Sequence, residues 1–83
     1  MSKILVEVYL PAALRSFDIR IPGELKLRQI TPLVASAVAQ MAWPLYSAGQ
    51  QPVLCDRETG KILNVNMNPW QLGLKNGARL MLI

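Results

Sequence analysis

The spacing of apolar residues along this chain changes from that of β-strands to that of a helix, and this change most limits what the chain can fold into. Residues 3–10 (KILVEVYL) and 16–21 (SFDIRI) place side chains alternately on two faces, the period-two pattern of β-strands. Residues 27–41 then carry apolar side chains at the three- and four-residue spacings of a helix. A single helix covers only one face of a sheet, so the pattern predicts an α+β domain whose other sheet face is open.

Turn residues and short apolar runs predict the strands and their order. A short connection after Pro11 joins the first two strands into an antiparallel hairpin. The later turns are expected at Gly60, at Asn68–Pro69 and at Asn76–Gly77. Three further strands are expected at residues 53–56, 61–65 and 79–83. The first and last strands are expected to pair at the centre, which makes a mixed sheet of four to five strands.

The helix is expected to begin between Arg28 and Thr31 and to end before Trp43–Pro44. Pro32 lacks a backbone N–H and is tolerated in the first turn, with Thr31 as N-cap, whereas a start at Leu27 would need a kink. The apolar residues that should face the sheet are Leu27, Ile30, Val34, Ala37, Val38 and Met41.

Length and composition favour one soluble domain that spans residues 1–83. The sequence is 52% hydrophobic and 17% charged, as in folded domains rather than disordered ones. No apolar run reaches the roughly 18–20 residues of a membrane span, and no signal-peptide pattern is present, so we expect a cytoplasmic protein without direct membrane insertion. Cys55 is the single cysteine, which argues against a disulfide-stapled secreted protein.

Motifs typical of catalysis or metal binding are missing from the sequence. There is no histidine, no glycine-rich phosphate loop and no acidic motif with metal-ligand spacing. We therefore expect no enzyme, no cofactor and no metal site. Cys55 is expected to be a small core residue, and Glu7 and Asp18 to be ion-paired or solvated. Trp43 and Trp70 each adjoin a proline, and the sequence leaves open whether they close the core or anchor a partner.

The order of the elements, the second strand Phe17–Ile21, and Leu74 followed by Asn76–Gly77 and the last strand Arg79–Ile83 resemble ubiquitin-like β-grasp domains. More closely, the chain is similar to the YukD/EsaB proteins of type VII (WXG-protein) secretion systems. The resemblance implies a non-enzymatic accessory or regulatory protein that binds a membrane or ATPase component of the secretion apparatus. It also implies no conjugation, because the sequence stops at Ile83 inside the last strand, where conjugated relatives carry an exposed Gly-Gly tail.

The resemblance places a partner-binding patch on the open sheet face. Alternation predicts that Leu5, Leu54, Met81 and Ile83 lie on this face, with Arg79 and Lys3 at its rim. Two alternatives stay open: a one-residue slip in the short third strand, which would exchange its faces, and burial of these residues in a homodimer.

The net charge of +4 leaves two further functions open. Nine Lys and Arg residues are spread singly along the chain, which favours a solvated surface over a nucleic-acid patch. A small nucleic-acid-binding domain and a self-assembling β-grasp module are therefore the alternatives to a protein-binding domain.

Overall fold

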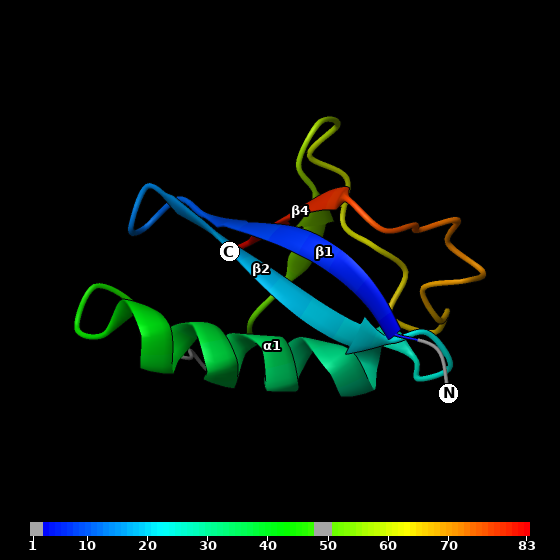
Figure 1. Cartoon of the computed structure of the whole chain (residues 1–83), viewed down its shortest axis with the longest axis horizontal. Coiled ribbons are helices and arrows are strands. Elements are labelled where there is room, and N and C mark those ends of the chain that lie inside the picture. The colour runs from blue at the N-terminus through cyan, green and yellow to red at the C-terminus, as the bar shows by residue number, and fades with distance from the viewer. Residues whose placement is uncertain (1–2, 48–50) are drawn as a thin grey trace.

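The computed structural model describes residues 3–47 and 51–83, and within them one helix packs across one face of a four-stranded sheet (Figure 1). In chain order the elements are β1 (Lys3–Leu10), β2 (Arg15–Pro22), α1 (Leu27–Ala42), β3 (Leu54–Asp56) and β4 (Ala78–Leu82). The strands lie in the order β2-β1-β4-β3. β1 runs antiparallel to β2 and parallel to β4, and β3 runs antiparallel to β4. The predicted hairpin and the central pairing of the first and last strands are confirmed.

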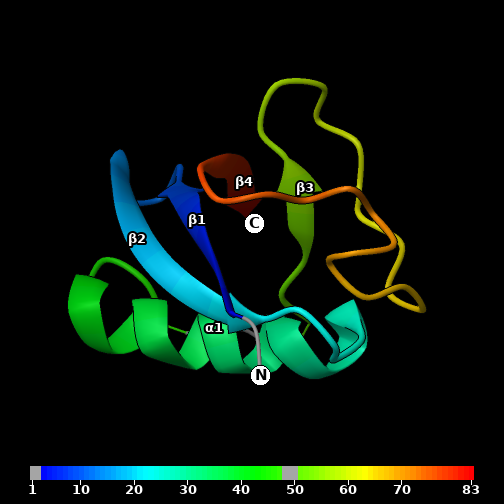
Figure 2. The same cartoon turned by 45° about the vertical axis from the view of Figure 1, so that its right-hand side comes forward.

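The core lies between the helix and one face of the sheet (Figure 2). Every second residue of β1 points into it and is at most 1% exposed, as strand alternation requires. Its buried members include Ile4, Val6, Val8 and Leu10 from β1, Leu80 and Leu82 from β4, and Leu27, Ile30, Val34 and Val38 from α1. The prediction for Met41 is wrong, because the buried stripe continues through Ala35 and Ala42 and leaves Met41 48% exposed.

The helix begins at Leu27, although the position of Pro32 predicted a start between Arg28 and Thr31. The first-turn amides of Leu27 and Arg28 donate to the carbonyls of Met67 and Val65, at 2.9 and 3.0 Å. These carbonyls belong to the connection between β3 and β4, so residues distant in sequence satisfy the helix start. Pro32 therefore lies inside the helix and is accommodated there on the exposed side.

The predicted returning strand over residues 61–65 does not form. Only an isolated bridge joins Ile62 to Cys55, and the amide of Leu63 bonds the carbonyl of Leu54 at 3.1 Å. The side chain of Asn64 then accepts a hydrogen bond from the amide of Asn66 at 2.9 Å, which turns the chain away from the sheet. The sheet therefore has four strands within the part of the chain that the structure describes.

The turn at Asn76–Gly77 holds the start of β4 against β1. The amide of Leu5 donates to the side-chain oxygen of Asn76, and the amide of Gly77 donates to the carbonyl of Leu5, both at 2.8 Å. Gly77 has φ +89°, a left-handed conformation that glycine adopts without a steric cost. This predicted turn therefore also sets the register of the central parallel pair.

Candidate partner-binding face

The sheet face opposite α1 is covered by no element among residues 3–47 and 51–83 (Figure 2). Strand register assigns its side chains. Tyr9 lies opposite Met81 on β4, and Glu7 lies between Asp18 on β2 and Arg79 on β4. This face, which we call the outer face, thus carries charged and aromatic residues on the two central strands.

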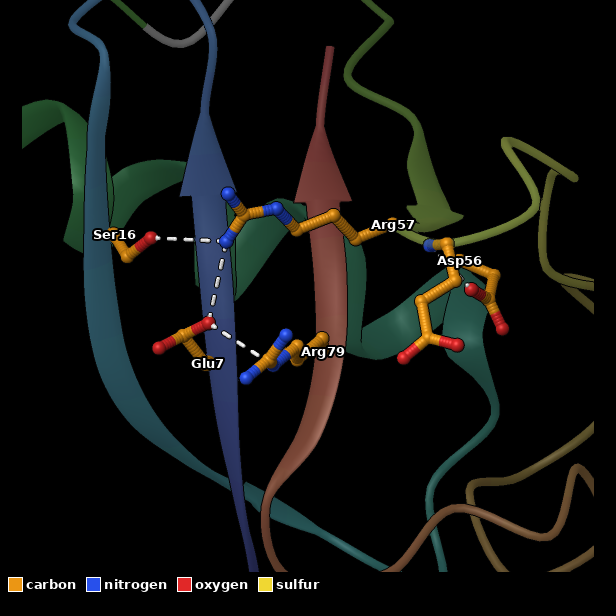
Figure 3. A network of polar contacts seen from close by, with 6 residues as sticks. Glu7, Ser16, Asp56, Arg57 and Arg79 are labelled. Carbon is orange, nitrogen blue, oxygen red and sulfur yellow. Dashed lines mark hydrogen bonds and ion pairs between the residues drawn. The ribbon is translucent and has the colours of Figure 1, made fainter.

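Arg57 organises the centre of the outer face, as Figure 3 shows. It follows β3 directly, and its side chain crosses β4 to reach the residues of β1 and β2. One guanidinium nitrogen lies 3.3 Å from a Glu7 carboxylate oxygen and 3.4 Å from the Ser16 hydroxyl. The guanidinium carbon lies 4.1 Å from the centre of the Tyr9 ring, a cation–π distance. The Nε of Arg79 lies 3.8 Å from the same Glu7 oxygen.

This network orders the surface more than it stabilises the fold. The side chains of Arg57 and Glu7 are each 36% exposed, and the Arg79 side chain is 62% exposed. Exposed ion pairs contribute about 0.2–1 kcal/mol, because water and salt screen them. The two arginines and the tyrosine are therefore held in place at a surface where arginine and tyrosine commonly anchor protein partners.

The prediction that Leu54 lies on the open face is wrong. Leu54 pairs with Leu82 across the β3–β4 register, and directly opposed residues share a face. Leu82 is 0% exposed and Leu54 is 3% exposed, so both lie in the core. The one-residue alternative for the third strand is the correct one: Cys55, and not Leu54, points to the outer face opposite Met81.

The remaining predicted residues do lie outside the core, but they form no continuous apolar patch. Leu5 is 39% exposed and Ile83 is 56% exposed, while Met81 is half-buried and Arg79 is exposed. Val6 pairs with Ala78, so Leu5 lies level with the residue before β4. That residue, Gly77, comes six residues before Ile83. At about 3.3 Å per residue, Leu5 and Ile83 are therefore about 20 Å apart along the strands. The Arg57–Glu7–Arg79 network occupies the surface between them.

Cys55 is buried, as predicted, but beneath the outer face and not within the main core. It is 1% exposed, and burial raises the pKa of its thiol. A raised pKa keeps the thiol protonated and poorly nucleophilic near neutral pH. Cys55 therefore has the environment of a packing residue.

The two tryptophans differ in their surroundings, and neither is buried. Trp43, just after α1, is 72% exposed, so it does not close the core. Trp70 is 50% exposed and packs against Gly23 in the connection between β2 and α1. Glu7 and Asp18 are direct cross-strand neighbours, and Glu7 is ion-paired, as expected.

Sequence reasoning did not find Arg57 or Tyr9 as members of the site. Arg57 reaches Glu7 only because β3 and β1 lie on either side of β4, and the two residues are far apart in sequence. Residue spacing carries no signal for such a contact. The pattern did indicate that Tyr9 shares a face with Leu5 and Glu7, but an aromatic residue on a strand is not a specific signal.

The described residues also bear on metal sites and membrane-spanning helices. Residues 3–47 and 51–83 contain no group of three or more Cys, Asp or Glu side chains that could hold a metal ion. Over the same two ranges, no helix has the length and apolar character needed to cross a bilayer.

Comparison with solved structures identifies the fold. The chain superposes on the EccD5 ubiquitin-like domain from Mycobacterium xenopi with a TM-score of 0.85 and 15% identity, over 100% of this chain and 94% of that one. The ubiquitin-like domain of the type VII secretion system protein ECCD1 from Mycobacterium tuberculosis matches with a TM-score of 0.69 and 16% identity, over 100% and 99%. The ubiquitin of Caldiarchaeum subterraneum matches with 0.66 and 14%, over 99% and 92%.

These likenesses show that the chain has the ubiquitin-like β-grasp fold, as the sequence predicted. No protein-family model matches the sequence, and no curated protein matches it significantly.

Proposed function

We propose that this chain is a ubiquitin-like component of a type VII secretion system and acts by binding another protein non-covalently at the cytoplasmic side of the apparatus. The observation that carries the proposal is the likeness to the EccD5 ubiquitin-like domain, with a TM-score of 0.85 over the whole chain. The ECCD1 domain, named as part of the same kind of system, supports it. The partner we propose is a cytosolic part of a membrane or ATPase component of the apparatus.

The proposed docking surface is the outer face around Arg57, Arg79 and Tyr9. Arginine and tyrosine are enriched among the residues that dominate binding energy, because they combine a large contact area with directional hydrogen bonding. Here Glu7 and Tyr9 hold the Arg57 guanidinium in place, so less side-chain entropy is lost on binding. The two cations share one carboxylate, which leaves positive charge for an acidic patch on the partner.

The test is co-purification and calorimetric titration of the chain with cytosolic regions of secretion-system membrane and ATPase proteins encoded in the same genome. Arg57→Ala and Arg79→Ala should each weaken binding about 5- to 30-fold, the range of a contact residue worth about 1–2 kcal/mol. Lys61→Ala is the matched control, since Lys61 is an exposed cation in the turn after β3. If all three variants bound the partner with equal affinity, the outer face would not be the docking surface. Binding to none of these proteins would retire the secretion-system role itself.

A further inference from the structure

Strand β2 is a free edge of the sheet. It pairs with β1 on one side, and no strand of the described residues pairs with it on the other. Half of its backbone N–H and C=O groups therefore point away from the sheet. Edge strands usually avoid further pairing by being short, by bulges, by proline or by charged side chains. β2 is eight residues long, and its one proline, Pro22, lies at its very end.

We propose that β2 pairs antiparallel with β2 of a second copy of this chain, about a two-fold axis at Ile19. In this register Asp18 of each copy lies opposite Arg20 of the other, so two ion pairs form on the outer face. On the other face, Ile19 meets its own copy and Phe17 lies opposite Ile21. A two-fold interface uses the same patch on both copies, so that patch must be complementary to itself. In this register β2 meets that requirement. The pairing joins the two sheets into one of eight strands.

Charge selects this register over its neighbours. A shift by one residue to an axis at Asp18 places the two Asp18 carboxylates opposite each other. The opposite shift, to an axis at Arg20, opposes two guanidinium groups. Like charges directly opposite destabilise a strand pair, whereas opposite charges contribute about 0.2–1 kcal/mol each. Axes that fall between residues would pair core-facing with outward-facing side chains, which alternation forbids.

Asp18 also has no ion-pair partner among the described residues of the single chain. It faces Glu7 across the β1–β2 pair, a like-charge contact. Glu7 is compensated by Arg57 and Arg79, but Asp18 takes part in no ion pair among the residues that the structure describes. Arg20 of a second copy supplies the missing cation.

A groove beneath the free edge extends the proposed interface. It has a volume of about 290 Å³ and lies between β2 and α1. Its lining is mostly apolar and includes Ile19, Ile21, Leu33 and Ala37, with the cations Lys3 and Arg20 also among the lining residues. Leu33 is 60% exposed although it is a large apolar residue. Two-fold pairing of β2 brings the two grooves together beneath the joined strands, so the exposed leucines become buried.

Beyond Arg28 the helix carries no charged residue that could oppose this association. No charged residue occurs between Gln29 and Cys55, although the chain as a whole carries +4. The net charge makes two copies repel each other overall, so an interface between them needs little uncompensated charge. The proposed interface instead joins the helix surface around Leu33 to a strand on which Asp18 and Arg20 are complementary. The third charge of β2, Arg15, lies at its first residue and falls opposite Gly23, outside the paired strands. This proposal is independent of the outer-face docking site.

The test uses the whole chain in sedimentation equilibrium and in size-exclusion chromatography with light scattering. Wild-type chain is expected to show a monomer–dimer equilibrium. Asp18→Arg and Arg20→Asp should each weaken it about tenfold or more, because each turns two attractive pairs into repulsive ones. An equimolar mixture of the two variants should dimerise as well as the wild type, since every mixed pair is again of opposite sign. Leu33→Glu should also dissociate the dimer.

Glu58→Arg and Lys61→Asp are the controls, because they change the net charge equally at exposed positions away from β2. Circular dichroism checks that each variant is folded. A wild-type chain that stays monomeric into the millimolar range would overturn the proposal. So would a dimer that the swaps leave intact, or a mixture no more associated than its parts. Binding of an extended peptide from another protein at this edge, with no self-association, would also overturn it.

Discussion

The indole ring of Trp70 lies directly against Gly23, so that the connection between β3 and β4 packs on the connection between β2 and α1. A Cβ atom added to Gly23 would overlap the ring. The φ angle of Gly23 lies outside the left-handed region, so glycine is needed here for space and not for backbone conformation.

We expect Gly23→Ala to lower the free energy of unfolding by about 1–3 kcal/mol, the usual cost of overpacking. Urea denaturation measures it. In a chain that also carries Trp70→Ala, the same change should cost much less, because the atoms that the methyl group overlaps are gone. Additive losses in this double-mutant cycle would contradict the contact.

Gly60→Ala gives a contrast to Gly23→Ala. Gly60 has φ +75° and open space around it, so the substitution costs only backbone strain, about 1–2 kcal/mol. Trp70→Ala should leave this cost unchanged. If Trp70→Ala reduced the cost of both glycine substitutions, its effect would be a general loosening of the fold and not the removal of one contact.

Leu54 and Ile83 are expected to differ sharply when truncated. Leu54→Ala should destabilise by about 2–5 kcal/mol, since it opens a cavity in the core. Ile83→Ala should cost about 0.5 kcal/mol or less, because Ile83 is more than half exposed. Chemical denaturation of both variants under the same conditions checks the assignment of faces. Comparable losses of stability in the two variants would mean that Leu54 lies on the outer face and not in the core.

Pro32→Ala is expected to stabilise the domain by about 1–3 kcal/mol. Proline inside a helix removes a hydrogen bond and costs about 3 kcal/mol against alanine, partly offset by its stiffening of the unfolded chain. Ser36→Ala, also exposed on α1, is the control and should gain about 0.5 kcal/mol or less. A loss of stability in Pro32→Ala would show that Pro32 packs into the apolar groove it lines beside Leu27 and Leu54.

Asp18→Asn should change folding and association in opposite directions. It removes the like-charge contact with Glu7, so the monomer gains about 0.2–1 kcal/mol, less at high salt. It also removes the partner of Arg20 in the proposed dimer and should weaken association. Denaturation of dilute protein and sedimentation of concentrated protein separate the two effects. Weakened folding would show that Asp18 has a stabilising contact within its own chain.

The thiol of Cys55 should react slowly with a disulfide reagent in the folded protein and fully in denaturant. Burial shields the sulfur and raises its pKa, so both access and thiolate content are low near neutral pH. Labelling should quicken as the pH rises toward the thiol pKa. Ser36→Cys, made in a Cys55→Ser chain, is an exposed control. Equal labelling of the two folded proteins would place Cys55 at the surface.

The sequence alone determined the hairpin of β1 and β2, the existence of α1, the turn at Asn76–Gly77 and the mixed α+β class. These features depend on local rules: alternation of side chains, helical spacing, and turn residues with special backbone freedom. Each operates within a few residues, so one sequence is enough to read it. The resemblance of their order to that of ubiquitin-like domains implied the fold, which the solved structures show.

The tertiary structure alone decided where α1 begins, which face Leu54 takes and what lies at the centre of the outer face. The helix starts at Leu27 because carbonyls near residue 66 satisfy its first amides. A three-residue strand such as β3 is too short for alternation to fix its faces, and its pairing with Leu82 settles them. Arg57 follows β3 and Glu7 lies on β1, and the two meet only because β4 lies between these strands in the sheet. Such contacts join distant segments, and local residue patterns do not encode them.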